Sequence, residues 1–446
     1  MNITELSELM RNCGIVGAGG AGFPSYAKLN KKADTIILNC AECEPMLRLH
    51  RQLLARRAHE IMTALSAVVE AVGAERALIA IKSSYKEAID AVKAELENFS
   101  NISIKFLPRV YPAGDEIIAI YEATGRRVEA GNLPISVGVI VYNVETMFNV
   151  YNAIKNNHGV ISKYVTIAGE VNNSITVKVP LGITLKQVID LAGGATVKDY
   201  RLLVGGPMTG HLDNENSVVT KTTNAVVVLP ADHYVVKRRE ININVSLNRA
   251  MSACCQCHYC TDMCPRHLLG YPIDPARLMR AVSTDCTSNP APFLNANYCS
   301  GCNLCEMFSC FQGLNPKSII GEVKTQLKKN GVKPPKPQMR DIDPLRNGKR
   351  VSTQRIISRL GLSKYEIDAP YTEKKYKFSK VKLLLSQGIG APAVPCVKAG
   401  DTVKRGQRIA EPLSDALSVA LNSSISGTVT EVTPRYITVE AREANE

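Results

Sequence analysis

Residues 254–265 read Cys-Cys-Gln-Cys-His-Tyr-Cys-Thr-Asp-Met-Cys-Pro, which places cysteines at positions 254, 257, 260 and 264 with a proline after the last. In this spacing three cysteines bind one [4Fe–4S] cluster, and the fourth reaches a second cluster. A second run is therefore expected. Cys299, Cys302 and Cys305 repeat the triplet, and Cys310 follows as the fourth ligand. The duplication predicts a helical segment that binds two [4Fe–4S] clusters.

The two runs are expected to exchange their fourth ligands. Cys310 would then join Cys254, Cys257 and Cys260, and Cys264 would join Cys299, Cys302 and Cys305. The second run departs from the usual pattern, because four residues precede Cys310 and Phe311 stands where proline is usual. Zinc is the alternative metal, although zinc sites usually pair two Cys-x2-Cys elements. Most of the other cysteines, including the spare neighbour Cys255, are expected to be ordinary small hydrophobic residues.

Length and composition predict a chain of several globular domains. The sequence has 446 residues, of which 45% are apolar, too many for one ordinary core. It contains no apolar run near the roughly 18 residues that span a bilayer, and its N-terminus does not resemble a signal peptide. We therefore expect no transmembrane segment and a location inside the cell, where cysteines more often bind metal than form disulfides.

The formal net charge of +13 is compatible with nucleic acid, an anionic membrane or acidic small molecules as partners. The basic residues are scattered, however, and only 5% of the residues are aromatic. No surface of interleaved basic and aromatic residues is visible. The sequence predicts that the protein has no nucleic-acid partner.

A glycine-rich segment, Gly-Ile-Val-Gly-Ala-Gly-Gly-Ala-Gly-Phe-Pro-Ser-Tyr-Ala-Lys, occupies residues 14–28. Glycines allow backbone N–H groups to approach a phosphate or a planar ring closely, and the final lysine adds positive charge. Although Gly17, Gly19 and Gly22 satisfy the dinucleotide-binding pattern, the residues before them look helical, which argues against a Rossmann unit.

Three further segments accompany this one: Asn-Cys-Ala-Glu-Cys-Glu-Pro at 39–45, Tyr-Pro-Ala-Gly-Asp-Glu at 111–116 and Tyr-Asn-Val-Glu-Thr at 142–146. Together the four segments resemble the flavin-binding NADH subunit of respiratory complex I. The departures from that family are Ala41 and Cys43 in place of acidic and hydroxyl residues, and Tyr142 in place of an asparagine.

This resemblance implies an FMN site with an adjoining NADH site. Asp115 and Glu116 would edge the nicotinamide as the catalytic residues, and Phe23 could stack on the adenine. Asn39 and Asn143 would bond the ring or ribityl groups of the flavin. The implied cofactor-binding residues are Gly17, Gly19, Gly20, Gly22, Phe23, Lys28, Asn39, Cys43, Glu44 and Asn143.

Composition and periodicity divide the chain into five regions of a multidomain α/β protein. Residues 1–158 alternate short strands, expected at 35–38, 77–81, 104–110 and 137–142, with helical stretches, such as one from Leu49 to Val72. They predict the flavin-binding α/β domain. Residues 159–235 predict a small α+β module, which resembles the β-grasp modules of the soluble-ligand-binding (SLBB) type. Residues 236–330 are the double-cluster segment, and residues 331–376 predict a polar linker with one short helix.

Residues 377–446 predict a C-terminal all-β barrel-sandwich hybrid. Residues 397–407 and 426–429 look like the two halves of a lipoyl-type hammerhead, which usually carries a cofactor on a lysine. The position expected for that lysine falls near Ala416, and no lysine lies between Glu411 and Thr430. The barrel is therefore expected to be structural.

The order of these parts resembles the cobalamin reductases of propanediol-utilisation bacterial microcompartments. The resemblance implies NADH as electron donor, cob(II)alamin as the corrinoid substrate, a corrinoid adenosyltransferase and shell proteins as partners, and a location in a cytoplasmic microcompartment. The C subunit of the Rnf complex has similar parts, but its barrel comes first. Two alternatives stay open: an Rnf-like subunit that passes electrons to a ferredoxin or another protein, and a non-enzymatic iron–sulfur carrier or scaffold.

Overall fold

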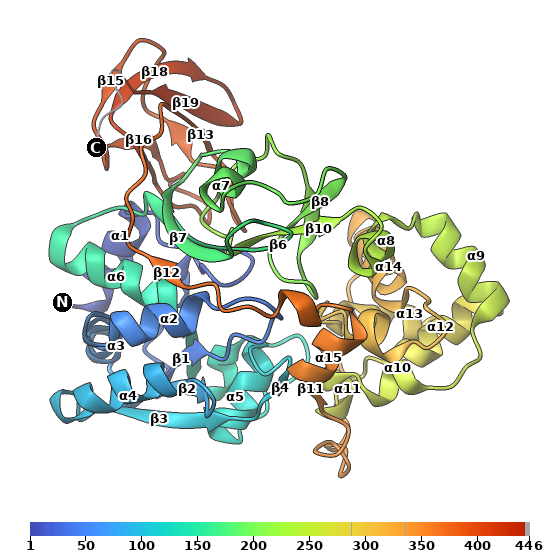
Figure 1. The fold of residues 1–446 in the computed structure, drawn as a ribbon. Helices are drawn as coiled ribbons and strands as arrows, with labels where there is room; N and C mark the ends of the chain where they lie inside the picture. Colours follow the sequence, from blue (N-terminus) through green and yellow to red (C-terminus); the bar gives the residue numbers. More distant parts are fainter. Residues whose placement is uncertain (287, 335, 442–446) are drawn as a thin grey trace.

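The structure, a computed structural model, describes residues 1–286, 288–334 and 336–441. Figure 1 shows the N-terminal α/β part, a mixed sheet above it, a group of short helices to one side and a β barrel at the top. Across the described residues no helix is both long and apolar enough to cross a bilayer.

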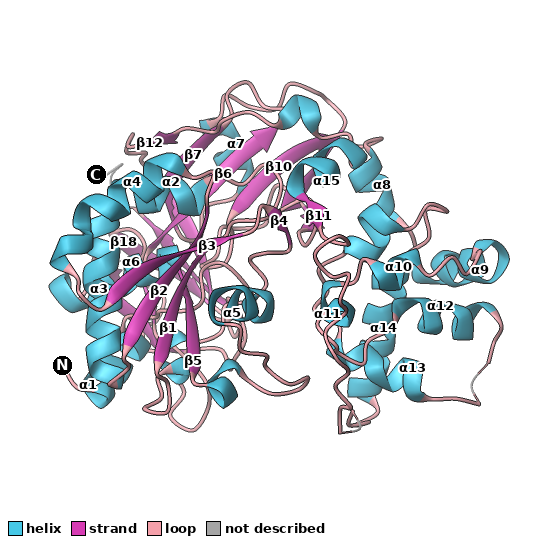
Figure 2. Cartoon of the chain, turned by 90° about the horizontal axis from the view of Figure 1, so that it is seen from below, coloured by secondary structure: helices cyan, strands magenta, loops and turns pink. Residues whose placement is uncertain are grey.

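The N-terminal part is built on a parallel sheet of order β3-β2-β1-β5. Strands β1, β2 and β5 are apolar and nearly continuously buried, as expected for a parallel sheet covered by helices on both faces, whereas the edge strand β3 is largely exposed. On β1, Ile36 and Leu38 face a core shared with α1, α3 and α6, whereas Ile37 faces the core that contains α5 (Figure 2). The elements are α1 (Ile3–Asn12), β1 (Thr35–Cys40), α2 (Leu49–Arg56), α3 (Ala58–Val72), β2 (Arg76–Lys82), α4 (Lys86–Glu95), β3 (Ile102–Leu107), β4 (Val110–Tyr111), α5 (Glu116–Thr124), β5 (Val139–Asn143) and α6 (Val144–Asn156).

The stretch from Leu49 to Val72, expected as one helix, forms two helices. Arg57 separates α2 from α3, because its backbone leaves the helical region with φ −135° and ψ 34°. The break turns α2 toward the edge of the sheet, so that His50 on α2 comes within 3.3 Å of the Asn143 side chain at the end of β5.

The second part is a mixed sheet of order β12-β7-β6-β10-β8-β9 with one helix, α7, packed on it. The parallel pair β6 and β10 is flanked by antiparallel partners, which fits the expected β-grasp module. Its elements are β6 (Ser162–Gly169), β7 (Ile175–Pro180), α7 (Leu185–Leu191), β8 (Tyr200–Val204), β9 (His211–Asp213) and β10 (Ala225–Pro230).

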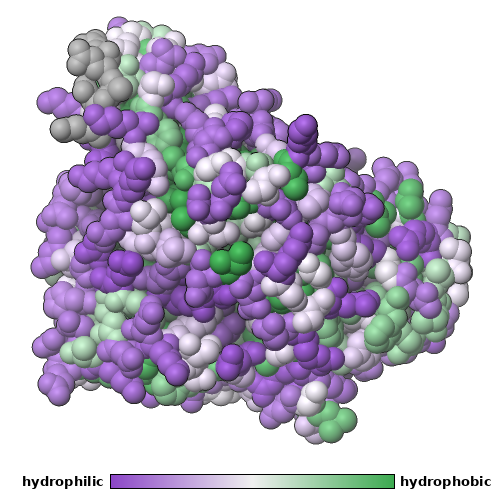
Figure 3. All heavy atoms as spheres, in the orientation of Figure 1, coloured by the Kyte–Doolittle hydropathy of each residue, from purple (hydrophilic) through white to green (hydrophobic). Residues whose placement is uncertain are grey.

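The cysteine-rich part consists of short helices around a small core formed by Ala250, Leu278, Met279 and Ile320. Figure 3 shows a mostly hydrophilic surface, with hydrophobic side chains gathered at the edge formed by this part. Its elements are α8 (Tyr234–Glu240), α9 (Ile243–Ala253), α10 (Tyr259–Asp262), α11 (Pro265–Leu268), α12 (Pro275–Ser283), α13 (Ala291–Leu294), the π-helical turn η5 (Cys305–Ser309) and α14 (Pro316–Lys329).

Residues 331–376, expected as a linker, supply strands to two other parts of the molecule. Strand β11 (Val351–Ser352) pairs with β4 of the α/β part, and β12 (Tyr371–Thr372) pairs with β7 of the mixed sheet. Helix α15 (Thr353–Arg359) lies between them and matches the short helix expected there. The segment therefore pairs through its strands with both the α/β part and the mixed sheet, in addition to connecting the cysteine-rich part to the barrel.

The C-terminal part consists of two antiparallel sheets, β13-β19-β18-β15 and β14-β16-β17. Their inward-facing residues, including Val381, Val429 and Ile437, are fully buried. The strands are β13 (Lys380–Leu384), β14 (Val394–Pro395), β15 (Thr402–Val403), β16 (Arg408–Glu411), β17 (Leu421–Asn422), β18 (Gly427–Val432) and β19 (Tyr436–Glu440).

Candidate functional site

The carboxyl edge of the parallel sheet brings the two predicted asparagines together. Asn39 of β1 stands opposite Asn143 of β5 in the strand register. The Asn39 amide donates to the carbonyl of Gly114 (2.9 Å), and the Asn143 side chain accepts the backbone N–H of Glu145 at the start of α6 (2.9 Å). Ligands bind at this edge in open α/β sheets. Asn39 and Asn143 are half-buried, so their amides line an accessible edge.

The glycine-rich segment forms a loop beside Asn143. A bridge between Val16 and Pro24 closes the loop, and the Gly17 N–H donates to the Phe23 carbonyl (2.9 Å). A side chain at Gly19 would overlap the Asn143 amide, so only glycine permits this approach. Gly20 is exposed with open space beside it, and Gly22 has a positive φ of 72°.

Lys28 and Glu116 form an ion pair at the same edge. The Lys28 Nζ lies 2.7 Å from Glu116 Oε1 and donates to the carbonyl of Val141 (3.0 Å). Both side chains are partly exposed, so the pair is weak and a ligand phosphate could compete with the carboxylate for the ammonium group.

Asp115 caps helix α5 and contacts the cysteine-rich part. Its carboxylate accepts the N–H groups of Ile117 and Ile118. Nη2 of Arg266, two residues after Cys264, lies 2.8 and 2.9 Å from the two carboxylate oxygens. The ion pair joins the candidate NADH edge to a predicted cluster-binding segment.

Cys43 and Glu44, both predicted to bind the cofactor, have different surroundings. Cys43 lies against Gly114, where a side chain would come within 3.2 Å of its Sγ, and burial raises the pKa of its thiol to about 11. The Glu44 carboxylate accepts the N–H groups of Met208 and Thr209 at 2.8 and 2.9 Å, and burial raises its pKa. Glu44 thus links the loop between β8 and β9 of the mixed sheet to the carboxyl edge of the parallel sheet, which we call the flavin edge.

The first set of cysteines lines one cavity in the cysteine-rich part. Cys254, Cys257, Cys260 and Cys310 border it together, as the expected exchange of fourth ligands requires. Cys257 is exposed, so this set reaches the surface. We call it the outer ligand set.

The second set lies deeper, against the flavin edge. Cys264 and Cys299 pack on the core that contains Ile117 and Ile118 of α5. Cys302 packs on the same core as Cys43, and its carbonyl accepts the Tyr111 hydroxyl at 2.6 Å. We call Cys264, Cys299, Cys302 and Cys305 the inner ligand set.

Both ligand sets carry backbone N–H groups directed at a thiol sulfur. The Gly301 N–H points at Cys299 Sγ and the Leu314 N–H at Cys310 Sγ, each at 3.3 Å, the kind of bond that tunes a cluster.

Burial raises the pKa of Cys260 and of Cys264 to about 12. Iron binds the thiolate, so loading each site must release protons that the buried thiols otherwise keep. Cluster binding is therefore coupled to pH in both sets.

Three residues of the site were not predicted from the sequence: Arg266, His50 and Thr146. Burial lowers the pKa of His50 to about 3, so a neutral imidazole lies beside Asn143. The Thr146 hydroxyl accepts the N–H of Ala18 (3.0 Å) and orients the glycine-rich loop. Thr146 lies within the quoted 142–146 segment, and Arg266 directly follows the Cys264-Pro265 pair, whereas no comparable sequence signal marks His50.

Comparison with known domain families assigns each part. Residues 10–152 match the Nuo51 FMN-binding domain, 164–211 the SLBB domain, 253–315 the 4Fe-4S dicluster domain and 368–445 the RnfC barrel sandwich hybrid domain. The predicted fold class is confirmed, and the cofactors are FMN and two [4Fe–4S] clusters. The close glycine approach at Asn143 and the two four-cysteine sets fit these groups.

Solved structures show the same fold. A crystal structure of NAD+-reducing [NiFe]-hydrogenase in the H2-reduced state has a TM-score of 0.50 and 19% identity, covering 77% of this chain and 68% of that one. At this identity the likeness concerns the fold alone.

Full-length relatives are more similar. Cobalamin reductase PduS of Citrobacter freundii is 42% identical over 97% of this chain and 96% of its own length. Cobalamin reductase PduS of Salmonella typhimurium is 40% identical over 98% of this chain and 97% of its own. The chain therefore belongs to the cobalamin reductase PduS family.

Proposed function

We propose that the protein is an NADH-dependent oxidoreductase that reduces cob(II)alamin to cob(I)alamin. The observation that carries the electron route is the position of the inner ligand set, which shares packed cores with the flavin edge, while the outer set opens to the surface. The full-length similarity to cobalamin reductases supplies the acceptor.

FMN, when bound, accepts a hydride from NADH and releases electrons singly, which nicotinamide alone does not do. In the proposed site Asn39 and Asn143 orient the flavin, and the N–H groups of the glycine-rich loop approach it closely. Lys28 would leave Glu116 to meet the phosphate. Asp115 and Glu116 would position the nicotinamide, with Asp115 held in place by Arg266.

The cysteine sets would deliver electrons in order from the inner set to the outer one. In the inner set Cys305 is buried and the other three cysteines are half-buried, so a cluster held there would be less open to solvent than one beside the exposed Cys257. The outer set borders a cavity with Cys255 and His258 at the surface, where a corrinoid could approach. The His267 side chain is engaged by the Ile273 carbonyl and by Arg340.

The proposed function places the protein beside a corrinoid adenosyltransferase, which consumes cob(I)alamin, and within a microcompartment with its shell proteins. Cob(I)alamin is a strong nucleophile and reductant, so a short transfer distance to its consumer protects the product. The support for this placement is the relatedness to PduS proteins and the chemistry of the product.

The test is an anaerobic purification with reconstituted clusters, followed by iron and flavin assays and an NADH titration. Eight irons and one FMN per chain, about the content of two cubanes and one flavin, with NADH-dependent loss of the cob(II)alamin EPR signal, would support the reductase. A flavin-free protein that does not oxidise NADH would contradict it.

A second candidate function is electron delivery to another protein, as in Rnf-type complexes. Phe311 directly follows Cys310 in the sequence, and its side chain is 67% exposed. Its ring stacks on that of Tyr259. An exposed aromatic residue next to an outer ligand is a suitable contact for a protein acceptor. NADH-dependent reduction of a ferredoxin, with cob(II)alamin left unreduced, would favour this function.

A further inference from the structure

We propose that the C-terminal barrel is a positioning element of the flavin site: its 387–390 loop, together with Lys221, holds the glycine-rich loop in the shape that binds FMN. This inference rests on the proposed flavin function. It assigns the barrel, which lacks an attachment lysine, a structural role at the flavin site.

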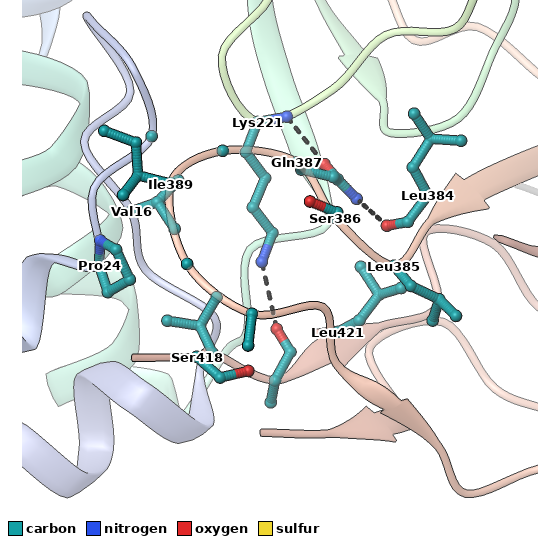
Figure 4. Close-up of a pocket in the computed structure, with 16 residues that line it drawn as sticks. Val16, Pro24, Lys221, Leu384, Leu385, Ser386, Gln387, Ile389, Ser418 and Leu421 are labelled. Carbon is teal, nitrogen blue, oxygen red and sulfur yellow. Dashed lines mark hydrogen bonds between the residues drawn. The ribbon is translucent and has the colours of Figure 1, made fainter. Parts of the chain in front are cut away.

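The barrel loop lies directly against the glycine-rich loop. The N–H of Ile389 donates to the carbonyl of Ala21 at 3.0 Å. A Cβ atom on Gly388 would come within 2.6 Å of the Gly22 oxygen and 2.7 Å of its Cα, so the two backbones touch with no room for a side chain. Figure 4 shows this loop curving around the cavity toward Val16 and Pro24, the residues that close the glycine-rich loop.

Lys221 ties three parts of the molecule together at the same place. Its buried Nζ donates to the carbonyls of Gly14 (2.8 Å) and Ala420 (3.1 Å), which lie just before the glycine-rich loop and in the barrel. Its backbone N–H donates to the Gln387 side chain at 2.9 Å. A buried ammonium is held only where such acceptors satisfy it, so separating the barrel would remove one of its two carbonyl acceptors.

The turn expected to carry an attachment lysine instead packs toward the flavin domain. The Arg11 guanidinium of the flavin domain donates to the Leu413 carbonyl at 2.7 Å, and within the barrel the Ala391 N–H donates to the Leu417 carbonyl at 2.8 Å. Ala416, which takes the place of the lysine, is half-buried in this turn. The turn therefore cannot swing freely while these contacts persist.

The glycine-rich loop is thus held from two sides. Thr146 of α6 fixes Ala18 on one flank, and the barrel loop fixes Ala21 and Gly22 on the other. Gly19 and Gly20 between them are exposed. Since glycine is the most flexible residue, flanking contacts would spare FMN the entropic cost of ordering the loop.

The first test measures hydrogen exchange of the full-length wild-type protein with and without FMN. We expect FMN to slow exchange in peptides covering residues 384–391 of the barrel as well as residues 15–24. Slowing confined to residues 15–24 would overturn the inference and leave the proposed function intact. If FMN binds nowhere, the proposed function itself fails and the inference fails with it.

The second test uses Gly388→Ala, which places a methyl group against the Gly22 backbone. We expect the dissociation constant for FMN to rise about tenfold or more, because overpacking forces the glycine-rich loop to shift. Iron content and the EPR spectra of the clusters should remain those of the wild type.

Gly348→Ala is the matched control, since a Cβ atom there meets nothing closer than 3.6 Å. Unchanged FMN affinity in Gly388→Ala with full iron content would overturn the inference. If this variant misfolds, the exchange experiment on the wild type decides.

Discussion

Arg266 and Asp115 form an ion pair in which one guanidinium nitrogen lies 2.8 and 2.9 Å from the two carboxylate oxygens, with both side chains largely buried. Arg266 follows the inner ligand Cys264, and Asp115 caps the helix at the candidate NADH edge. One charge pair therefore links the proposed hydride-accepting site to the first cluster on the electron route.

Arg266→Gln should lower the reduction potential of the inner cluster by an amount on the order of tens of mV, because it removes a positive charge that favours the reduced cluster. The outer cluster should keep its potential. An anaerobic redox titration followed by EPR measures both values. Arg280→Gln is the control: it also removes one arginine charge, but Arg280 bonds to Gln256 beside the outer set, so the potential of the inner cluster should not change. Equal potentials of the inner cluster in wild type and Arg266→Gln would contradict this assignment.

The exchange of fourth ligands predicts which variants lose the same EPR signal. Cys310→Ala and Cys254→Ala should abolish one signal, and Cys264→Ala and Cys299→Ala the other, each with about half the iron lost. If Cys310→Ala instead matched Cys299→Ala, each run would bind its own cluster and the exchange would be wrong.

Lys28→Ala should lower the FMN content and the rate of NADH oxidation together, because the cation expected to meet the flavin phosphate is removed. A loss of about tenfold in FMN affinity corresponds to one charge-assisted bond. Lys31→Ala, which alters an exposed lysine three residues away, should leave both values unchanged. Full flavin content and full NADH oxidation in Lys28→Ala would show that the pocket lies elsewhere.

Stability should depend on pH through Lys221. Burial lowers the pKa of its ammonium to about 7, whereas a lysine in an unfolded chain has a pKa of about 10.4. Between these values the unfolded state binds one more proton than the folded state, so the free energy of unfolding rises with pH. Below about pH 7 Lys221 is charged in both states, and the destabilisation caused by burying its charge is greatest. The neighbouring Cys13 thiol also has a raised pKa, which keeps it from supplying a counter-charge near neutral pH.

The measurement is the melting temperature of wild type and Lys221→Met from about pH 7 to about pH 10. The difference, wild type minus variant, should increase with pH. A constant difference would mean that Lys221 stays charged in the folded protein.

The sequence predicted most of the strands and helices around the flavin edge because they carry strong local signals. The apolar runs that became β1, β2 and β5 and the spaced cysteines are read directly from residue order. The break at Arg57 was missed because neither glycine nor proline marks it. Strands β11 and β12 were missed because two-residue strands exist only through their tertiary partners.

The site was predicted unevenly for a similar reason. Asn39, Asn143 and the cysteines belong to segments whose spacing is a recognisable pattern. Arg266 acquires its role only where α11 meets α5, and Lys221 only where three domains meet. Contacts between distant segments leave no local pattern, so their residues emerge from the structure alone.

The most direct test of the central claim is the stoichiometry of corrinoid reduction by the reconstituted protein under anaerobic conditions. A limiting amount of NADH is added to excess cob(II)alamin, and cob(I)alamin is trapped with an alkylating agent. The account predicts about two alkylated corrinoids per NADH, since a hydride carries two electrons and each corrinoid accepts one. NADH oxidised with flavin and clusters reduced, yet without alkylated corrinoid, would contradict it.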